Sequence, residues 1–437
     1  MAQSPDALAA RFDFAGPDPQ SLETAEQTVA VILDPRRRGE LYPYLRRLHE
    51  LEPRHRTEAL HGRPARLITS HADAVALLSN HALVSDERNA QIFDTGPSGE
   101  RFFELMKRTL LYMDPAAHDR IRAMIAREFT PRAIERYEPL MQRVVGELLD
   151  RAADAGEVDL VRDLAYALPT AVICEIMGVP GDDLAIFHEW LNDFARRGDV
   201  SGVTPDVIAA GEAAVAGFTD YFLDLVRERR RHPGDDLVTI LTRARDEQGP
   251  LTDDELVALC ILMIQAGHET TADMIGLGVL ALLRHPDELH ALRDDPALIR
   301  NAIEEMLRYD GSNQLVQRVS HEDFELGDTK IAAGEVCSIL TGAAGRDPAR
   351  FEDPDRLDIR RKDIQHFGFG GGSHVCLGAS LARGELRMMI GGLIERFPDL
   401  ELGDGELAYR DSLVLRGLKN LPLRLTRRSG RAGSAAG

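Results

Sequence analysis

The segment that most constrains the fold is residues 252–284, where helical periodicity continues without a break. Apolar residues recur there at i, i+3 and i+4, Thr252 suits an N-cap with Glu255 three residues later, and Pro286 prevents continuation. At about 1.5 Å per residue, a helix of about 30 residues spans about 45 Å, the width of a whole domain. The other elements must therefore pack around this helix.

Helical spacing dominates the remaining chain, and strand-like runs are short. Helices are predicted at 41–51, 71–79, 115–128, 132–154, 160–177, 183–197, 205–231, 235–246, 286–294, 296–309 and 377–396, and strands at 65–70, 316–320, 324–326, 335–340, 412–415 and 422–425. The prediction is a mainly α fold with small β-sheets. No linker divides the chain, so we expect one domain over residues 21–426, with disordered ends at 1–20 and 427–437.

Charge and hydropathy exclude several classes of partner. Lys and Arg total 52 against 72 Asp and Glu, and the formal charge of −20 argues against nucleic acid. The longest apolar run, residues 256–264, is far short of the ~20 residues that span a bilayer, and residues 1–20 contain no signal-like apolar stretch. The four cysteines form no C-x-x-C pair. We expect a cytoplasmic protein that binds neither membrane nor nucleic acid.

The centre of the long helix is polar although its position predicts burial. It reads Ala266, Gly267, His268, Glu269, Thr270 and Thr271. Gly267 costs about 1 kcal/mol relative to alanine in a helix, and the neighbouring hydroxyl and carboxyl groups compete for backbone hydrogen bonds. These residues predict a local opening of the helix, a defect that often marks a functional site.

A glycine-rich loop over residues 369–378 delivers Cys376 to the start of helix 377–396. The helix N-terminus offers a favourable dipole and free N–H donors, which lower a thiol pKa and suit a metal-bound sulfur. The alternative is a buried cysteine that acts as a small hydrophobe. A dinucleotide fingerprint fails because Ser373 stands where glycine is needed, and a zinc-protease motif fails because Ala272 replaces the second histidine after His268.

The loop from Phe369 to Gly378 resembles the haem-binding loop of the cytochrome P450 family at its Phe, Gly, basic, Cys and Gly positions. The resemblance extends from about residue 30 to residue 425. It implies the cytochrome P450 fold, with haem b (iron protoporphyrin IX) between the long central helix and the Cys-loop helix. Cys376 would be the proximal iron ligand, and Phe369 and Gly378 would contact the cofactor.

Two further motifs support this resemblance. Glu305 and Arg308 resemble the family's E-x-x-R pair, with Arg356 as the expected third member of a network that fixes the haem loop. Residues three apart lie on one helical face, so an ordinary solvated ion pair is the alternative.

The resemblance also implies ligands for the haem propionates, namely His118, Arg122, Arg318 and His374. Buried carboxylates require charged or hydrogen-bonding partners, so several convergent basic side chains are a physical requirement. The alternative for His118 and Arg122 is a solvent-facing pair.

The activity implied is monooxygenation, in which one oxygen atom of O2 enters a small organic substrate by hydroxylation or epoxidation. Glu269 and Thr270 are the residues expected to deliver protons to bound oxygen through ordered water. The alternatives are a Thr270 hydroxyl that bonds back to the preceding turn and a purely structural Glu269 carboxylate. Oxidative coupling, dehydrogenation or a non-catalytic haem-binding role stay open, because such proteins share these motifs.

Substrate contacts are expected from variable segments, with Phe93, Trp190, Ala266, Asn313, Gln314 and Leu413 lining the pocket. A natural-product intermediate is the expected substrate. Electrons are expected from a separate ferredoxin and ferredoxin reductase. Docking of the ferredoxin would use local positive charge from Arg120, Arg127, Arg383 and Arg387.

Overall fold

The computed structural model describes residues 16–60, 64–199, 203–246 and 249–426. Residues 1–15 and 427–437, within the ends predicted to be disordered, lie outside the described residues. The N-terminal segment predicted to be disordered extended to residue 20, but Pro19–Ser21 form a 3-10 turn that Asp18 caps through its side chain.

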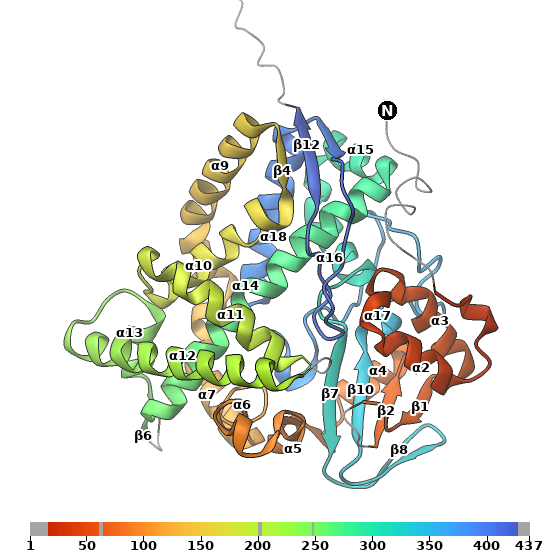
Figure 1. Cartoon of the computed structure of the whole chain (residues 1–437), viewed down its shortest axis with the longest axis horizontal. Helices are drawn as coiled ribbons and strands as arrows, with labels where there is room; N and C mark the ends of the chain where they lie inside the picture. The colour runs from red at the N-terminus through yellow and green to blue at the C-terminus, as the bar shows by residue number, and fades with distance from the viewer. Residues whose placement is uncertain (1–15, 61–63, 200–202, 247–248, 427–437) are drawn as a thin grey trace, which may run out of the picture.

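The long central helix is α14 (Asp253–Arg284), which runs through the middle of the molecule (Figure 1). Thr252 and Glu255 form the predicted capping box, with the Glu255 N–H donating to Thr252 Oγ1 at 3.2 Å. Helices α10 (Ala167–Met177), α12 (Pro205–Arg231), α16 (Ile299–Tyr309) and α18 (Ala379–Arg396) pack against it. Burial on several sides explains why α14 is apolar around much of its circumference.

The predicted opening of this helix is wrong, because α14 is α-helical from end to end. Gly267 has a different reason: a Cβ there would lie 2.9 Å from the Ile173 side chain of α10. Glycine therefore allows close approach of α10 to α14.

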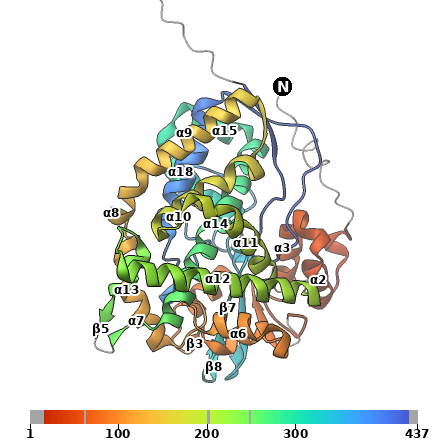
Figure 2. The same cartoon turned by 60° about the vertical axis from the view of Figure 1, so that its left-hand side comes forward.

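Other helices surround this core (Figures 1 and 2). Those of seven residues or more, within the described ranges, are also α2 (Ala25–Leu33), α3 (Leu41–Leu51), α4 (His71–Leu78), α6 (Glu100–Lys107), α7 (Pro115–Ile125), α9 (Glu138–Ala155), α11 (Leu184–Gly198), α13 (Leu237–Arg243) and α15 (Pro286–Asp294). The predicted helix 132–154 is interrupted, since α8 (Pro131–Ile134) and a 3-10 turn precede α9. The predicted helix 235–246 ends at Arg243, because β5 (Arg245–Asp246) pairs with β6 (Gly249–Pro250).

Small β-sheets complete the mainly α fold. A five-stranded sheet has the order β1 (Arg54–Thr57), β2 (Ala65–Ile68), β10 (Val336–Leu340), β7 (Leu315–Ser320) and β3 (Leu83–Val84). A three-stranded sheet joins β11 (Asp399–Leu402), β12 (Pro422–Thr426) and β4 (Glu157–Asp159), and β8 (Phe324–Leu326) pairs with β9 (Thr329–Ile331). Residues 412–415 form no strand, although Leu415 makes an isolated bridge with Asn313.

The five-stranded sheet lies beside α2 and α3, at the side of the molecule away from α9, α10 and α13 (Figure 1). Within the described ranges, no helix combines the length and apolar character that membrane crossing requires.

Candidate active site

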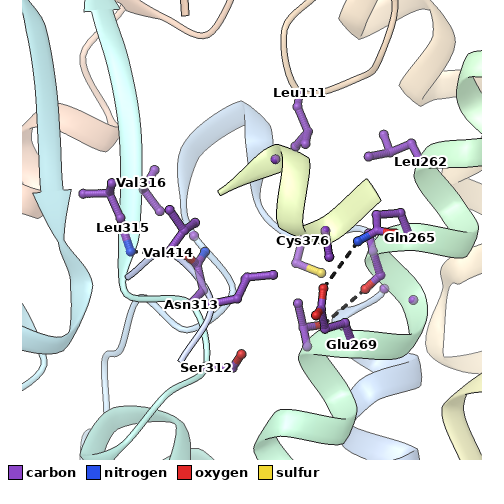
Figure 3. A pocket seen from close by; sticks show the side chains of 18 of the residues that line it. Leu111, Leu262, Gln265, Glu269, Ser312, Asn313, Leu315, Val316, Cys376 and Val414 are labelled. Carbon is purple, nitrogen blue, oxygen red and sulfur yellow. Dashed lines mark hydrogen bonds between the residues drawn. The ribbon is translucent and has the colours of Figure 1, made fainter. Parts of the chain in front are cut away.

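A cavity of about 1070 Å³ lies between α14 and the loop that precedes α18. Cys376 lines it, and its sulfur lies between Asn313 on one side and the α14 residues Gln265 and Glu269 on the other (Figure 3). The Cys376 N–H donates to the Phe369 carbonyl at 2.8 Å, which folds the loop back on itself. Gly372 has a φ of 67°, and its missing Cβ would meet the Leu78 carbonyl. Glycine is therefore required for this loop to reach its place.

The pKa of the Cys376 thiol differs from the prediction. Burial raises the pKa of Cys376, while the Gly378 backbone N–H and the Arg122 and Arg383 charges oppose that rise without cancelling it. The predicted lowering is wrong because desolvation outweighs the donors at the helix start. A metal cation is the partner that deprotonates such a thiol outright.

Four basic side chains gather at one edge of the cavity. The rings of His118 and His374 lie 4.1 Å apart between centroids, and Arg122 Nη2 donates to the Val375 carbonyl at 2.6 Å. Burial lowers the pKa of Arg318 to about 10. Burial, with the Arg318, His118 and Arg122 charges, lowers the pKa of His374 to about 3. The Arg122 and Arg318 charges favour an anionic ligand, and the neutral His374 can donate a hydrogen bond to it.

These residues fit the propionates of a haem. His118 is 1% exposed, and its Nε2 has no hydrogen-bond partner within the described residues. Its Nδ1 lies 3.0 Å from the Asp119 carboxylate, which leaves Nε2 for a ligand. An unpartnered buried ring nitrogen beside two arginines matches a ligand with two carboxylates, and a thiol in the same cavity matches its iron.

The α14 wall of the cavity holds the predicted acid and alcohol. Glu269 forms an ion pair with Arg410 and accepts a hydrogen bond from Gln265 Nε2 at 3.3 Å. The Thr270 hydroxyl donates to the Ala266 carbonyl at 3.1 Å, so its oxygen is left as an acceptor. Glu269 and Thr270 both line the cavity. Arg410, on the loop before β12, was not predicted.

The E-x-x-R network contains a different third residue. Arg308 and Glu305 are buried and joined by Nε to Oε2 at 2.7 Å and Nη2 to Oε1 at 2.8 Å. Arg361 Nε donates to Glu305 Oε1 at 3.1 Å. The predicted partner, Arg356, is wrong: its side chain is 61% exposed and lies 3.9 Å from Glu288. Arg356 contributes its backbone carbonyl, which accepts from Arg308 Nη2 at 3.1 Å.

Three of the six predicted pocket residues, Phe93, Ala266 and Asn313, line the cavity. The other three do not. Trp190 packs on Phe218 with 5.2 Å between ring centroids, because Gly217 leaves room for the indole on α12.

Gln314 and Leu413 also point elsewhere. Gln314 is 2% exposed and donates to the Gly311 carbonyl at 2.6 Å and the Tyr42 hydroxyl at 3.1 Å. Leu413 packs in the apolar cluster that includes Leu45 and Leu315. The Gly311 carbonyl and the Tyr42 hydroxyl therefore hold the Gln314 side chain away from the cavity, whereas the Asn313 side chain lines it.

The arginines expected to attract a redox partner are largely neutralised. Arg387 Nη2 lies 2.7 Å from Glu138, and Arg383 Nε lies 2.6 Å from Glu304. Arg120 pairs with Glu255. The positive charge that these arginines leave exposed near the Cys376 loop is therefore smaller than their number suggests.

A thiol-bearing loop on the cavity wall, a cationic edge and a polar-centred helix around one cavity define the haem-thiolate class of protein. The cytochrome P450 family model matches residues 206–416. The cytochrome P450 monooxygenase PikC of Streptomyces venezuelae is 40% identical over 402 residues, which cover 91% of this chain and 93% of that protein. The 6-deoxyerythronolide B hydroxylase of Saccharopolyspora erythraea is 35% identical and covers 83% of this chain and 91% of its own length.

A solved structure of P450BioI, in complex with hexadec-9Z-enoic acid ligated Acyl Carrier Protein, matches with a TM-score of 0.84 and 32% identity. The match covers 89% of this chain and 99% of that one. This chain belongs to the cytochrome P450 family, an identity that confirms the resemblance and the fold predicted from the sequence. It is an oxidoreductase that incorporates oxygen from O2, and its cofactor is haem b.

Proposed function

We propose that this chain hydroxylates or epoxidises a mainly apolar natural-product intermediate in the cavity, with Cys376 as the proximal iron ligand. The observation that carries the proposal is that the Cys376 sulfur and the α14 acid Glu269 lie on one cavity (Figure 3), which Thr270 also lines. The names of relatives such as 6-deoxyerythronolide B hydroxylase support a natural product as substrate.

The cofactor supplies oxygen activation when bound, because the thiolate donates electron density to the iron and favours O–O cleavage. His118, Arg122, Arg318 and His374 would hold the propionates. These residues have the charge and hydrogen-bonding capacity for two carboxylates. Phe369 and Gly378 would contact the porphyrin from the loop side.

Proton delivery is assigned to Glu269 and Thr270. Because the Thr270 hydroxyl donates its own hydrogen to the Ala266 carbonyl, its oxygen accepts a hydrogen bond from a water in the cavity. Glu269 is held by Arg410 and Gln265, and it must exchange one of these partners for water to pass a proton inward.

Substrate contacts on the opposite side come from Asn313 with Leu315, Val316 and Val414 (Figure 3). Asn313 Oδ1 accepts a hydrogen bond from the Leu315 N–H at 3.3 Å. The Asn313 amide nitrogen is then the group that would donate to a substrate. The pocket would therefore prefer a substrate that is apolar apart from an acceptor group, such as a carbonyl, near Asn313.

Electrons would come from a separate ferredoxin and its reductase in the cytoplasm. The partner would dock over the Cys376 loop, which is exposed at Val375. Arg127 and the ion-paired arginines near this loop would contribute to docking.

The first test is the absorption spectrum of the dithionite-reduced protein under carbon monoxide. The wild type should show the red-shifted Soret band of thiolate-ligated haem, and Cys376→Ala should lose it. Cys337→Ala, which changes a buried cysteine outside the cavity, is the matched control and should keep the band. A folded, haem-supplied wild type without the band would refute the proposal.

The second test addresses proton delivery. Thr270→Ala should release more peroxide per NADH oxidised, in an assay with surrogate redox partners, because oxygen is activated less efficiently. Thr271→Ser, which keeps a hydroxyl on the neighbouring residue, should stay close to wild type. Equal peroxide release from Thr270→Ala and the wild type would remove Thr270 from the mechanism.

A further inference from the structure

Two neighbouring glutamates on α16 enter different networks. Glu305 joins Arg308 and Arg361, as described above. Glu304 faces α18 and the Cys376 loop instead. Arg383 Nε donates to Glu304 Oε1 at 2.6 Å and Arg383 Nη2 donates to Oε2 at 2.9 Å, a two-pronged pair of the kind that fixes geometry.

His366 connects this pair to the backbone of the loop. The Gly368 N–H donates to His366 Nδ1 at 3.1 Å, so Nδ1 is an acceptor. Its other nitrogen, Nε2, lies 3.0 Å from Glu304 Oε2 and must carry the hydrogen. The His366 side chain is 5% exposed, so water competes little with either bond.

The same guanidinium also contacts the loop through an aromatic ring. Arg383 Cζ lies 4.4 Å from the centroid of Phe369, a cation–π contact. Phe369 in turn accepts the Cys376 N–H through its carbonyl. The loop is therefore held at Gly368 and at Phe369, both immediately before the turn that presents the sulfur.

The charges in this group act on the sulfur. Arg383 stacks on Phe369, whose carbonyl accepts the Cys376 N–H, so the guanidinium charge lies beside the loop that presents the sulfur. Burial raises the pKa of Glu304, but Arg383 and His366 outweigh burial and hold it at about 2. Glu304 is therefore an anion that partly cancels the guanidinium.

We propose that Glu304, Arg383 and His366 form a clamp that positions the Cys376 loop and sets the electrostatic potential at the sulfur. The inference rests on the proposed role of Cys376 as iron ligand. Arg383 is a positioning residue that stabilises the reduced, more negative state of the bound iron, and Glu304 limits that effect.

The test is potentiometric titration of the haem-loaded protein. Arg383→Gln should lower the reduction potential, because a cation near the sulfur is lost. Glu304→Gln should raise it, because the guanidinium is no longer compensated. A purely structural pair would not shift the potential in opposite directions from its two ends. Arg387→Gln is the matched control, since Arg387 lies one turn further along α18, pairs with Glu138 and should leave the potential unchanged.

Two more variants separate position from charge. Arg383→Lys keeps the charge but not the two-pronged geometry, so it should retain the potential better than Arg383→Gln. His366→Asn keeps an acceptor near Gly368 but loses the donor to Glu304. Both should speed the decay of the red-shifted carbon monoxide band to the band of haem without thiolate ligation, several-fold relative to Arg387→Gln.

Shifts of the same sign in Arg383→Gln and Glu304→Gln, or none beyond the Arg387→Gln control, would overturn the electrostatic part of the clamp. Unchanged band decay in Arg383→Lys and His366→Asn would overturn the positioning part. Failure of the proposed function is a different result, since it would appear as a wild type that lacks the red-shifted band.

Discussion

Replacing Glu385 with glutamine should stabilise this protein at neutral pH and not at acid pH. Glu385 lies on α18, is 1% exposed, and neither carboxyl oxygen has a hydrogen-bond partner within the described residues. Burial raises its pKa to about 8, and the nearby Thr271 hydroxyl only partly opposes the rise. The folded protein therefore holds this carboxyl protonated at pH 7, whereas the unfolded chain ionises it.

The magnitude follows from the difference between the two pKa values. The ordinary value is 4.5 and the folded value is about 8, so stability from this group is complete below the ordinary pKa and is lost as pH rises towards 8. Each pH unit in this window costs about 1.4 kcal/mol. The loss is under about 1 kcal/mol at pH 5 and about 3 kcal/mol at pH 7. Glutamine does not titrate, so Glu385→Gln avoids the loss.

The assay is urea unfolding of the haem-loaded protein, followed by far-ultraviolet circular dichroism at pH 5 and pH 7. The free energy of unfolding of Glu385→Gln minus that of the wild type should rise by about 2–3 kcal/mol between these pH values. Any cost of the buried amide itself cancels, because it is the same at both pH values. Glu395→Gln, an exposed change on the same helix, should show no such rise. A difference that does not change with pH would refute the assigned protonation state of Glu385.

Three other predictions concern packing and charge. Arg361→Gln should cost about 3–5 kcal/mol in urea unfolding, because it removes a partner of buried Glu305, while Arg356→Gln should cost under about 1 kcal/mol; equal costs would contradict the network. Gly267→Ala should destabilise the protein by about 1–2 kcal/mol although alanine favours helices. The double variant Gly267→Ala with Ile173→Ala should cost less than the sum of the two single variants. Arg318→Gln should release haem to apomyoglobin about tenfold faster, equivalent to about 1.4 kcal/mol, and an unchanged rate would remove Arg318 from the propionate site.

Local features of the sequence determined the framework of this protein. The capping box at Thr252 and the apolar repeat to Arg284 defined α14 to within one residue, because caps and periodicity act over a few residues. The glycines around Cys376 predicted the thiol loop for the same reason, since only glycine tolerates the backbone that the loop needs. The family resemblance followed from these local motifs.

Tertiary structure alone decided which distant partners meet. The sequence motif predicted Arg356 as the partner of Glu305. The path of the intervening loop instead brings Arg361 to the Glu305 carboxylate and leaves the Arg356 side chain exposed. Arg410 pairs with Glu269 from the loop before β12, where the sequence shows neither helical nor strand periodicity. Trp190, expected in the cavity, faces α12 instead, because helix rotation depends on the surfaces that surround it. A side chain's type and spacing are local properties, whereas its partner depends on the folding of the whole chain around it.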